Sequence, residues 1–228
     1  GGLVTRAEKE GWSNADLEEK AAQASPIKPS PREVFLPELL KKAGYVTAQF
    51  GKLDWGFNTW HAELKRHGWD HYAGYMDHQR AHGFYPTFLW KNGERLPLEG
   101  NTRPDAGITA ENYSAGATEK RRGNRDGKTT YAPDVMLRET LEFMEKNRNR
   151  PMFIFFSTNL PHGPVDIPPA ENTYAGHPEI RKAYTDASGP NRECAGAAEE
   201  YASMVGKLDK QVGAIVAQVR RLGLEKRT

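Results

Sequence analysis

The sequence lacks the features that would indicate a disulfide scaffold, a membrane span or a nucleic-acid partner. Its single cysteine, Cys194, excludes an internal disulfide and leaves no second thiol for a cysteine metal cluster. No stretch approaches the roughly 20 apolar residues that a membrane-spanning helix needs. The 32 basic and 30 acidic side chains leave a net charge of +2, too weak a field to favour nucleic acid or an anionic membrane.

The chain also begins at Gly1 without a methionine, a basic region or an apolar leader, so we expect an internal segment of a longer protein. With 37% apolar and 10% aromatic residues, the 228 residues suffice for one core, and we expect one domain or part of one. Residues 1–32 read as a polar lead-in that ends in closely spaced prolines, and 100–130 as a surface excursion without apolar periodicity.

A helix followed by a buried strand is predicted twice. The first helix runs from Pro37 and stops at Gly44, and the strand 45–50 follows it. The second helix is expected to be capped by Asp134, and the strand 152–158, "MFIFFST", has no polar alternation, as expected for a strand covered on both faces.

The last helix is predicted from apolar residues that recur at three- and four-residue steps between Tyr201 and Leu222, and Gly223 ends it. This order of helices and strands predicts an α/β fold in which helices bury the strands. Because no strand follows the last helix, we expect the sheet to continue beyond Thr228.

Two segments with chemical potential follow the predicted strands. Lys52 lies in "GKLDWG" after the first strand, and His162 lies in "NLPHGP" after the second. Ligands of open α/β sheets bind outside the carboxyl ends of the strands. A lysine and a histidine converging there could bind a sulfate or phosphate and protonate its leaving oxygen. Taken singly, each has a plainer interpretation: a solvent-facing lysine and a structural histidine.

The order of motifs is recognisable. "LPELLKKAGYVTAQFGKLDWGF" resembles the pattern "tLaelLkkaGYrTaxxGKWHLG" of the sulfatases in the alkaline phosphatase superfamily. The segments "HGWDHYAGY", "AHGFYPTFLWKNGE", "LEGN", "PMFIFFSTNLPHGPVDIP" and "YASMVGKLDKQVGAIVAQVRRLGL" follow in family order, so the resemblance covers residues 36–224. It implies a partial sulfatase catalytic domain over 1–228, with an alkaline-phosphatase-like sheet covered by helices.

The resemblance implies roles for particular residues. Lys52 matches the lysine that binds the sulfate and the nucleophile, and His162 matches the histidine near the leaving oxygen. Asp54 replaces a histidine, and two roles stay open for it: it orients Lys52 or the nucleophile, or it contacts the substrate directly. The loop "YMDHQRAHGFYP" matches the one over the substrate mouth, where His82 and Tyr85 are candidates for substrate binding. A surface histidine on an aromatic loop is the plainer interpretation of His82.

The resemblance implies two cofactors, calcium and formylglycine, and neither site is complete in this sequence. The family makes formylglycine from the Cys or Ser of a C/S-x-P-S/A-R motif. Cys194 in "RECAGAAEE" lacks the proline and arginine, and "PSPR" at 29–32 has the wrong order. The S-D-N-G segment that completes the family's calcium site is absent, so no metal ligand is assigned. We expect the 228 residues alone not to turn over a sulfate ester.

The predicted function is therefore that of a sulfuric ester hydrolase whose parent protein acts on a sulfated carbohydrate or an aryl sulfate. The resemblance is compatible with a periplasmic or extracellular location. Two alternatives stay open: a phosphodiesterase or phosphonate hydrolase of the same superfamily, and a non-catalytic sulfatase-like binding protein. The basic run between Lys120 and Lys128 is either a contact for a polyanionic glycan or a solvated loop.

Overall fold

The structure is a computed structural model that describes residues 10–11, 30, 32–53, 61–76, 80–102, 127–163, 165–185 and 195–228. The predicted lead-in 1–32 and excursion 100–130 lie mostly outside these residues and stay predictions. The elements are α3 (Leu36–Lys42), β1 (Val46–Lys52), α4 (His61–Arg66), β2 (His71–Tyr75), η1 (Arg80–His82), β3 (Phe88–Lys91), β4 (Glu94–Pro97), α6 (Ala132–Lys146), β5 (Met152–Ser157), η3 (Pro169–Glu171), α7 (Pro178–Thr185), α8 (Ala195–Arg221) and η5 (Glu225–Arg227).

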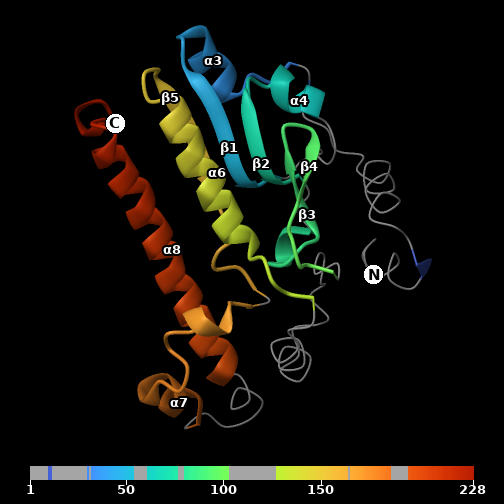
Figure 1. Ribbon diagram of the computed structural model, residues 1–228, viewed down its shortest axis with the longest axis vertical. Coiled ribbons are helices and arrows are strands. Elements are labelled where there is room, and N and C mark those ends of the chain that lie inside the picture. Colours follow the sequence, from blue (N-terminus) through green and yellow to red (C-terminus); the bar gives the residue numbers. More distant parts are fainter. Residues whose placement is uncertain are drawn as a thin grey trace.

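Five strands form one sheet in the order β4-β3-β2-β1-β5. β1 pairs in parallel with β2 and with β5, whereas β3 and β4 form an antiparallel hairpin on the far side of β2 (Figure 1). Because β2, β1 and β5 run in the same direction, their carboxyl ends meet at one edge of the sheet. The predicted α/β class is confirmed.

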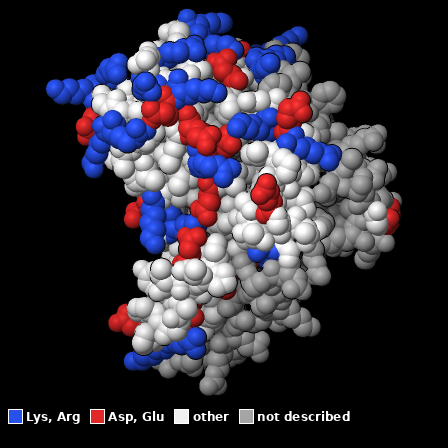
Figure 2. Space-filling view, in the orientation of Figure 1, with Lys and Arg blue, Asp and Glu red and all other residues white. Residues whose placement is uncertain are grey.

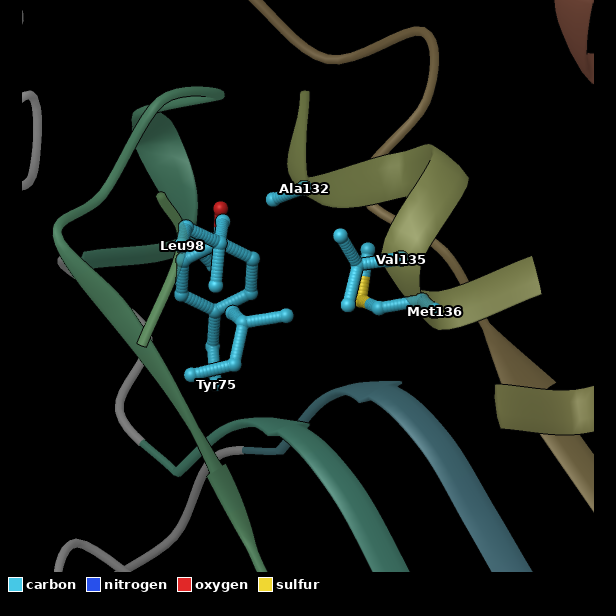
Figure 3. Packing of buried hydrophobic residues seen from close by; sticks show 7 residues of the cluster. Tyr75, Leu98, Ala132, Val135 and Met136 are labelled. Atoms are coloured by element: carbon cyan, nitrogen blue, oxygen red, sulfur yellow. The ribbon is translucent and has the colours of Figure 1, made fainter. Parts of the chain in front are cut away.

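α6 packs across β1 and β2 and contributes to two core clusters on that face (Figure 1). Figure 3 shows Ala132, Val135 and Met136 of α6 facing Tyr75 and Leu98, and Met136 is fully buried. The expected cap at Asp134 is wrong, because the helix begins at Ala132. A proline is tolerated in the first turn of a helix, so Pro133 lies inside α6 and Asp134 falls in its first turn.

The expectation that 152–158 is covered on both faces is also wrong for the described residues. β5 is the edge strand of the sheet, and Phe155 is 48% exposed. An apolar run without alternation predicted a strand correctly, but the same run cannot tell a central strand from an edge strand.

α8 runs beside α6 (Figure 1) and ends before Gly223, whose φ of +67° is a left-handed conformation that glycine adopts readily. Figure 2 shows basic and acidic side chains interspersed over the face in view. At the end of α6, Arg148 forms a local pair with Glu145 at 2.9 Å. In the part of the chain that is described, no helix is long and apolar enough to cross a membrane.

Candidate functional site

The two segments predicted to converge do meet at the carboxyl edge of the sheet. Gly51 of β1 pairs with Ser157 of β5, so the residues that follow these strands leave the sheet side by side. Lys52 is the last residue of β1, and His162 lies five residues beyond β5. Both line one crevice of about 520 Å³, which is completed by residues 157–161 and by Tyr201 of α8. A volume of this size fits a small organic ligand.

The backbone at Lys52 is held by buried hydrogen bonds. The Lys52 carbonyl oxygen accepts from Ser157 Oγ at 2.9 Å and from Gln49 Nε2 at 3.1 Å. Gln49 is fully buried and also donates to Ser157 Oγ. Because the backbone is fixed in this way, the half-buried lysine side chain projects from a rigid strand end.

Gly51 is required by the close approach of β1 and β5. A Cβ at this position would lie 2.1 Å from the Ser157 carbonyl oxygen, and φ at Gly51 is +124°. Only glycine combines that conformation with that contact, so the glycine beside Lys52 permits the tight pairing that places the lysine at the crevice.

The loop that carries His162 is anchored beneath its exposed imidazole. The His162 backbone N–H donates to the Asn159 carbonyl oxygen at 2.9 Å, and Nδ1 contacts the Gly163 carbonyl oxygen. Asn159 is buried, and its Nδ2 donates to the Ala81 carbonyl oxygen at 2.9 Å. The loop after β5 is therefore tied to the 3₁₀ turn η1.

That tie brings a second predicted histidine to the site. His82 ends η1, and its ring centroid lies 4.8 Å from that of His162, with 36° between the ring planes. The Tyr75 hydroxyl fixes the same turn by donating to the Gly83 carbonyl oxygen at 2.7 Å. The structure thus brings together Lys52, His162 and His82, and their chemical roles stay predictions.

Tyr85 is placed differently. It is 1% exposed and lies in a core cluster with Phe84, Tyr131 and Leu160, where its ring centroid is 5.2 Å from that of Tyr131. This position gives Tyr85 a packing role beneath the crevice, and it gives the predicted substrate contact no support.

The segment after His162 is held by a second polar contact. Lys128 Nζ lies 2.5 Å from Asp166 Oδ2, and the Tyr131 hydroxyl donates to the Asp166 carbonyl oxygen at 2.8 Å. Burial, with smaller effects from Tyr85 and Asp166, raises the pKa of Tyr131 well above its ordinary value. Tyr131 therefore keeps its proton and serves as a permanent hydrogen-bond donor to this loop.

Sequence reasoning missed the groups that support the site. Gln49, Asn159 and Asp166 act through buried hydrogen bonds to residues up to 108 positions away, and no local pattern indicates such partners. Tyr201 was grouped with the apolar residues of the last helix, and only the packing of α8 shows that it lines the crevice.

Several predicted residues lie outside the described part of the chain. They are Asp54, the rest of the substrate-mouth loop at 77–79, Cys194 and the basic residues 120–125. Among the residues that are described, no group of three or more His, Cys, Asp or Glu side chains could hold a metal ion. No metal ligand is therefore assigned among the described residues.

Comparison with known proteins supports the same family along almost the whole chain. The sequence profile of the sulfatase family matches residues 8–228. Human N-acetylgalactosamine-6-sulfatase is 28% identical over 135 residues, which cover 58% of this chain and 23% of that protein. N-acetylglucosamine-6-O-sulfatase of Bacteroides thetaiotaomicron is 22% identical over 127 residues, which cover 55% of this chain and 16% of that protein.

A solved structure has the same fold. That of Ps i-CgsB in complex with k-i-k-neocarrahexaose has a TM-score of 0.57 at 19% identity, covering 89% of this chain and 40% of that chain. The chain thus spans less than a quarter of the two curated relatives and less than half of this structure. Members of the matched family generally use calcium and formylglycine. With the family profile matched over residues 8–228, the chain belongs to the sulfatase family.

Proposed function

We propose that this chain supplies the sulfate-binding groups of a sulfuric ester hydrolase that acts on a sulfated carbohydrate. The observation that carries the proposal is the shared crevice of Lys52 and His162 at the ends of two adjacent parallel strands. The two sulfatases to which the chain is similar are named for amino sugars with a 6-sulfate, which supports a sugar sulfate as the substrate class.

Lys52 is assigned to the sulfate oxygens. Its ammonium group is a compact positive charge with three donors, suited to a tetrahedral anion. Because Gln49 and Ser157 hold the Lys52 backbone, little reorganisation is needed when negative charge develops on the sulfate oxygens. The lysine therefore stabilises the transition state as well as the bound substrate.

His162 is assigned to the leaving oxygen. Its exposed ring lies in the crevice wall, and the anchored loop limits its directions. When the bond between sulfur and the sugar oxygen breaks, that oxygen needs a proton, and a positioned imidazolium can donate it. His82 packs against the same ring and helps to orient it.

The nucleophile and the divalent cation are not assigned to any described residue. No cluster there could hold a metal, and Cys194 lies outside the described ranges. The steps proposed for Lys52 and His162 use neither group. The activity is accordingly proposed for the complete protein that contains this chain.

Two variants in the complete protein test the assignments through their dependence on the leaving group. Lys52→Ala should lower kcat/KM at least about 30-fold for both N-acetylglucosamine 6-sulfate and para-nitrophenyl sulfate. This factor corresponds to a loss of about 2 kcal/mol of transition-state stabilisation. His162→Ala should lower the rate much more for the sugar sulfate, because para-nitrophenolate leaves readily without a proton. Sulfate release would be measured for both substrates.

Lys210→Ala, an exposed lysine of α8, is the matched control and should leave both rates unchanged. An unchanged rate in Lys52→Ala would remove that residue from the site. Equal losses on both substrates in His162→Ala would remove the proton-donor role. A preference of the unmodified protein for an aryl phosphate diester would replace the sulfatase assignment by the phosphodiesterase alternative.

A further inference from the structure

A second hollow adjoins the sulfate crevice. It has a volume of about 710 Å³ and is lined by residues of α7 and of the first turns of α8. These two helices lie next to each other in Figure 1. Tyr201 lines both cavities, and its side chain is 49% exposed. The two cavities are therefore neighbours that share one aromatic wall.

The lining of the hollow suits a sugar ring. Tyr174 and His177 form one aromatic side, with ring centroids 5.6 Å apart, and Tyr201 forms another. Several alanines of α7 and α8 leave the space between these rings open. Tyrosine and histidine combine an apolar ring with a polar tip, so they can cover the C–H face of a sugar and still hydrogen-bond to its hydroxyl groups.

The walls of the hollow are fixed by contacts between its two sides. The Tyr174 backbone N–H donates to Ser203 Oγ of α8 at 3.1 Å, and that hydroxyl donates to Asn172 Oδ1 at 2.8 Å. Arg181 of α7 pairs with the buried Glu199 of α8 at 2.7 Å. These contacts fix α7 and the backbone at Tyr174 against α8, so a ligand meets a preformed site and loses less entropy on binding.

The charge of the lining selects the occupant. Among the described residues that line the hollow there is one carboxylate, Glu179, and no lysine or arginine. A second sulfate group would meet the like charge of Glu179 there, and the guanidinium of Arg181 at the wall is already paired with Glu199, whereas the crevice beyond Tyr201 contains Lys52. The hollow is therefore suited to an uncharged sugar.

We infer that the hollow between α7 and α8 is the binding site for the uncharged sugar unit next to the sulfated one. This inference rests on the proposed function, because it places the sulfated unit in the crevice of Lys52. It makes the protein selective for a glycan whose sulfated residue has an unsulfated neighbour, with Tyr201 as the shared contact.

The inference is tested by the binding of three ligands to the complete protein that contains this chain, prepared without formylglycine so that the ligands are not hydrolysed, and measured by titration calorimetry or NMR. The ligands are N-acetylglucosamine 6-sulfate, a disaccharide that joins it to galactose, and the same disaccharide with a sulfate on galactose. The neutral-neighbour disaccharide should bind about 3- to 10-fold more tightly than the monosaccharide, as expected for one added aromatic contact. The disulfated one should lose this gain.

Variants separate the two cavities. Tyr174 lines the hollow and not the crevice. Tyr174→Ala should therefore abolish the extra affinity for the disaccharide and leave the affinity for the monosaccharide unchanged. Tyr201→Ala should also abolish the gain, and Tyr201→Phe should keep most of it because the ring stays. Val212→Ala is the control, since Val212 lies on the same helix, is also 49% exposed and lines neither cavity.

The outcomes distinguish this inference from the proposed function. Lys52-dependent binding of the monosaccharide without any gain for the disaccharide would overturn the subsite and leave the sulfate crevice intact. A gain that survives Tyr174→Ala, or tighter binding of the disulfated ligand, would also overturn it. If none of the sulfated ligands bound and Lys52→Ala left the rate of sulfate release unchanged, the proposed function itself would be overturned.

Discussion

Helices α6 and α8 lie side by side, yet the inner face of α6 is mainly apolar and that of α8 is mainly polar. α6 buries Val135, Met136 and Phe143 against the sheet. α8 buries Ser203, Lys207 and Gln211. Among the apolar residues of α8, Met204 is fully buried, whereas four others are well exposed: Tyr201, Val205, Val212 and Val216. The apolar periodicity of the sequence therefore predicted both helices correctly, but it predicted the buried face correctly only for α6.

The difference follows from what each helix covers. α6 lies directly on β1 and β2, where its Phe143 packs with Val46, Ala48, Phe50 and Ala73, so its apolar residues complete that core. α8 contacts the flank of α6 through polar groups. Gln211 Nε2 donates to the Pro133 carbonyl oxygen at 2.9 Å, and Lys207 pairs with Asp134 at 2.7 Å. The inner face of α8 thus docks by hydrogen bonds and ion pairs on either side of one apolar contact, that of Met204 and Leu208 with the cluster around Tyr131.

The largest expected change in stability comes from a substitution in the apolar inner face of α6. Met136→Ala should lower the free energy of unfolding by about 2–5 kcal/mol, because Met136 is fully buried beside Tyr75 and its removal leaves a cavity (Figure 3). Val205→Ala on α8 is the control and should stay within about 0.5 kcal/mol, since Val205 is 44% exposed. Urea unfolding measures both, and similar losses would remove the distinction between the helices.

A smaller loss of stability is expected from a substitution in the polar inner face of α8. Lys207→Ala should cost about 1.5–3 kcal/mol, because it removes charge-assisted bonds to Asp134 and Glu171. Arg138→Ala removes an exposed pair with Glu142 at 3.9 Å and should cost less than about 1 kcal/mol. Urea unfolding at neutral pH compares the two variants. If Lys207→Ala were as mild as Arg138→Ala, packing alone would hold α8 in place.

The smallest effect at neutral pH concerns His71, which packs against Phe143 of α6 with ring centroids 5.4 Å apart. Burial, with smaller effects from Lys91 and Lys146, lowers the pKa of His71 from 6.5 to about 4. The unfolded chain therefore binds this proton more readily, so stability is full above pH 6.5 and declines as the pH falls towards 4. His71→Leu should remove that part of the decline.

Unfolding measured at several pH values, with NMR titration of His71, checks this prediction. At pH 7 the variant should differ little in its electrostatic contribution, because the imidazole is neutral in the folded state. An ordinary pKa for His71 in the folded protein, or an unchanged pH dependence in the variant, would contradict it.

For the fold, local signals were enough to find the main elements. Apolar periodicity and glycine stops predicted α3, α6 and α8, and β-branched and aromatic runs predicted β1 and β5. The edge position of β5 and the first turn of α6 were predicted wrongly. Both depend on neighbours, which a single segment does not specify.

For the site, the sequence indicated Lys52 and His162, because both follow predicted strands and both match a family motif. Their shared crevice depends on the parallel pairing of β1 with β5, whose strands lie about a hundred residues apart in the chain. His82 reaches the same place through the hydrogen bond from Asn159 to Ala81, and Tyr85 turned out to be buried. The side chains that support the site left no local signal.

The sequence by itself therefore indicated the family and the α/β class, and it predicted a lysine and a histidine for the site, since these follow from residue type and order. Only the tertiary structure decided which face of α8 is buried, that Tyr201 separates two cavities, and which buried groups hold Lys52 and His162. The physical reason is that burial and hydrogen bonding depend on atoms that are close in space, and chain order does not fix that proximity until the strands have paired.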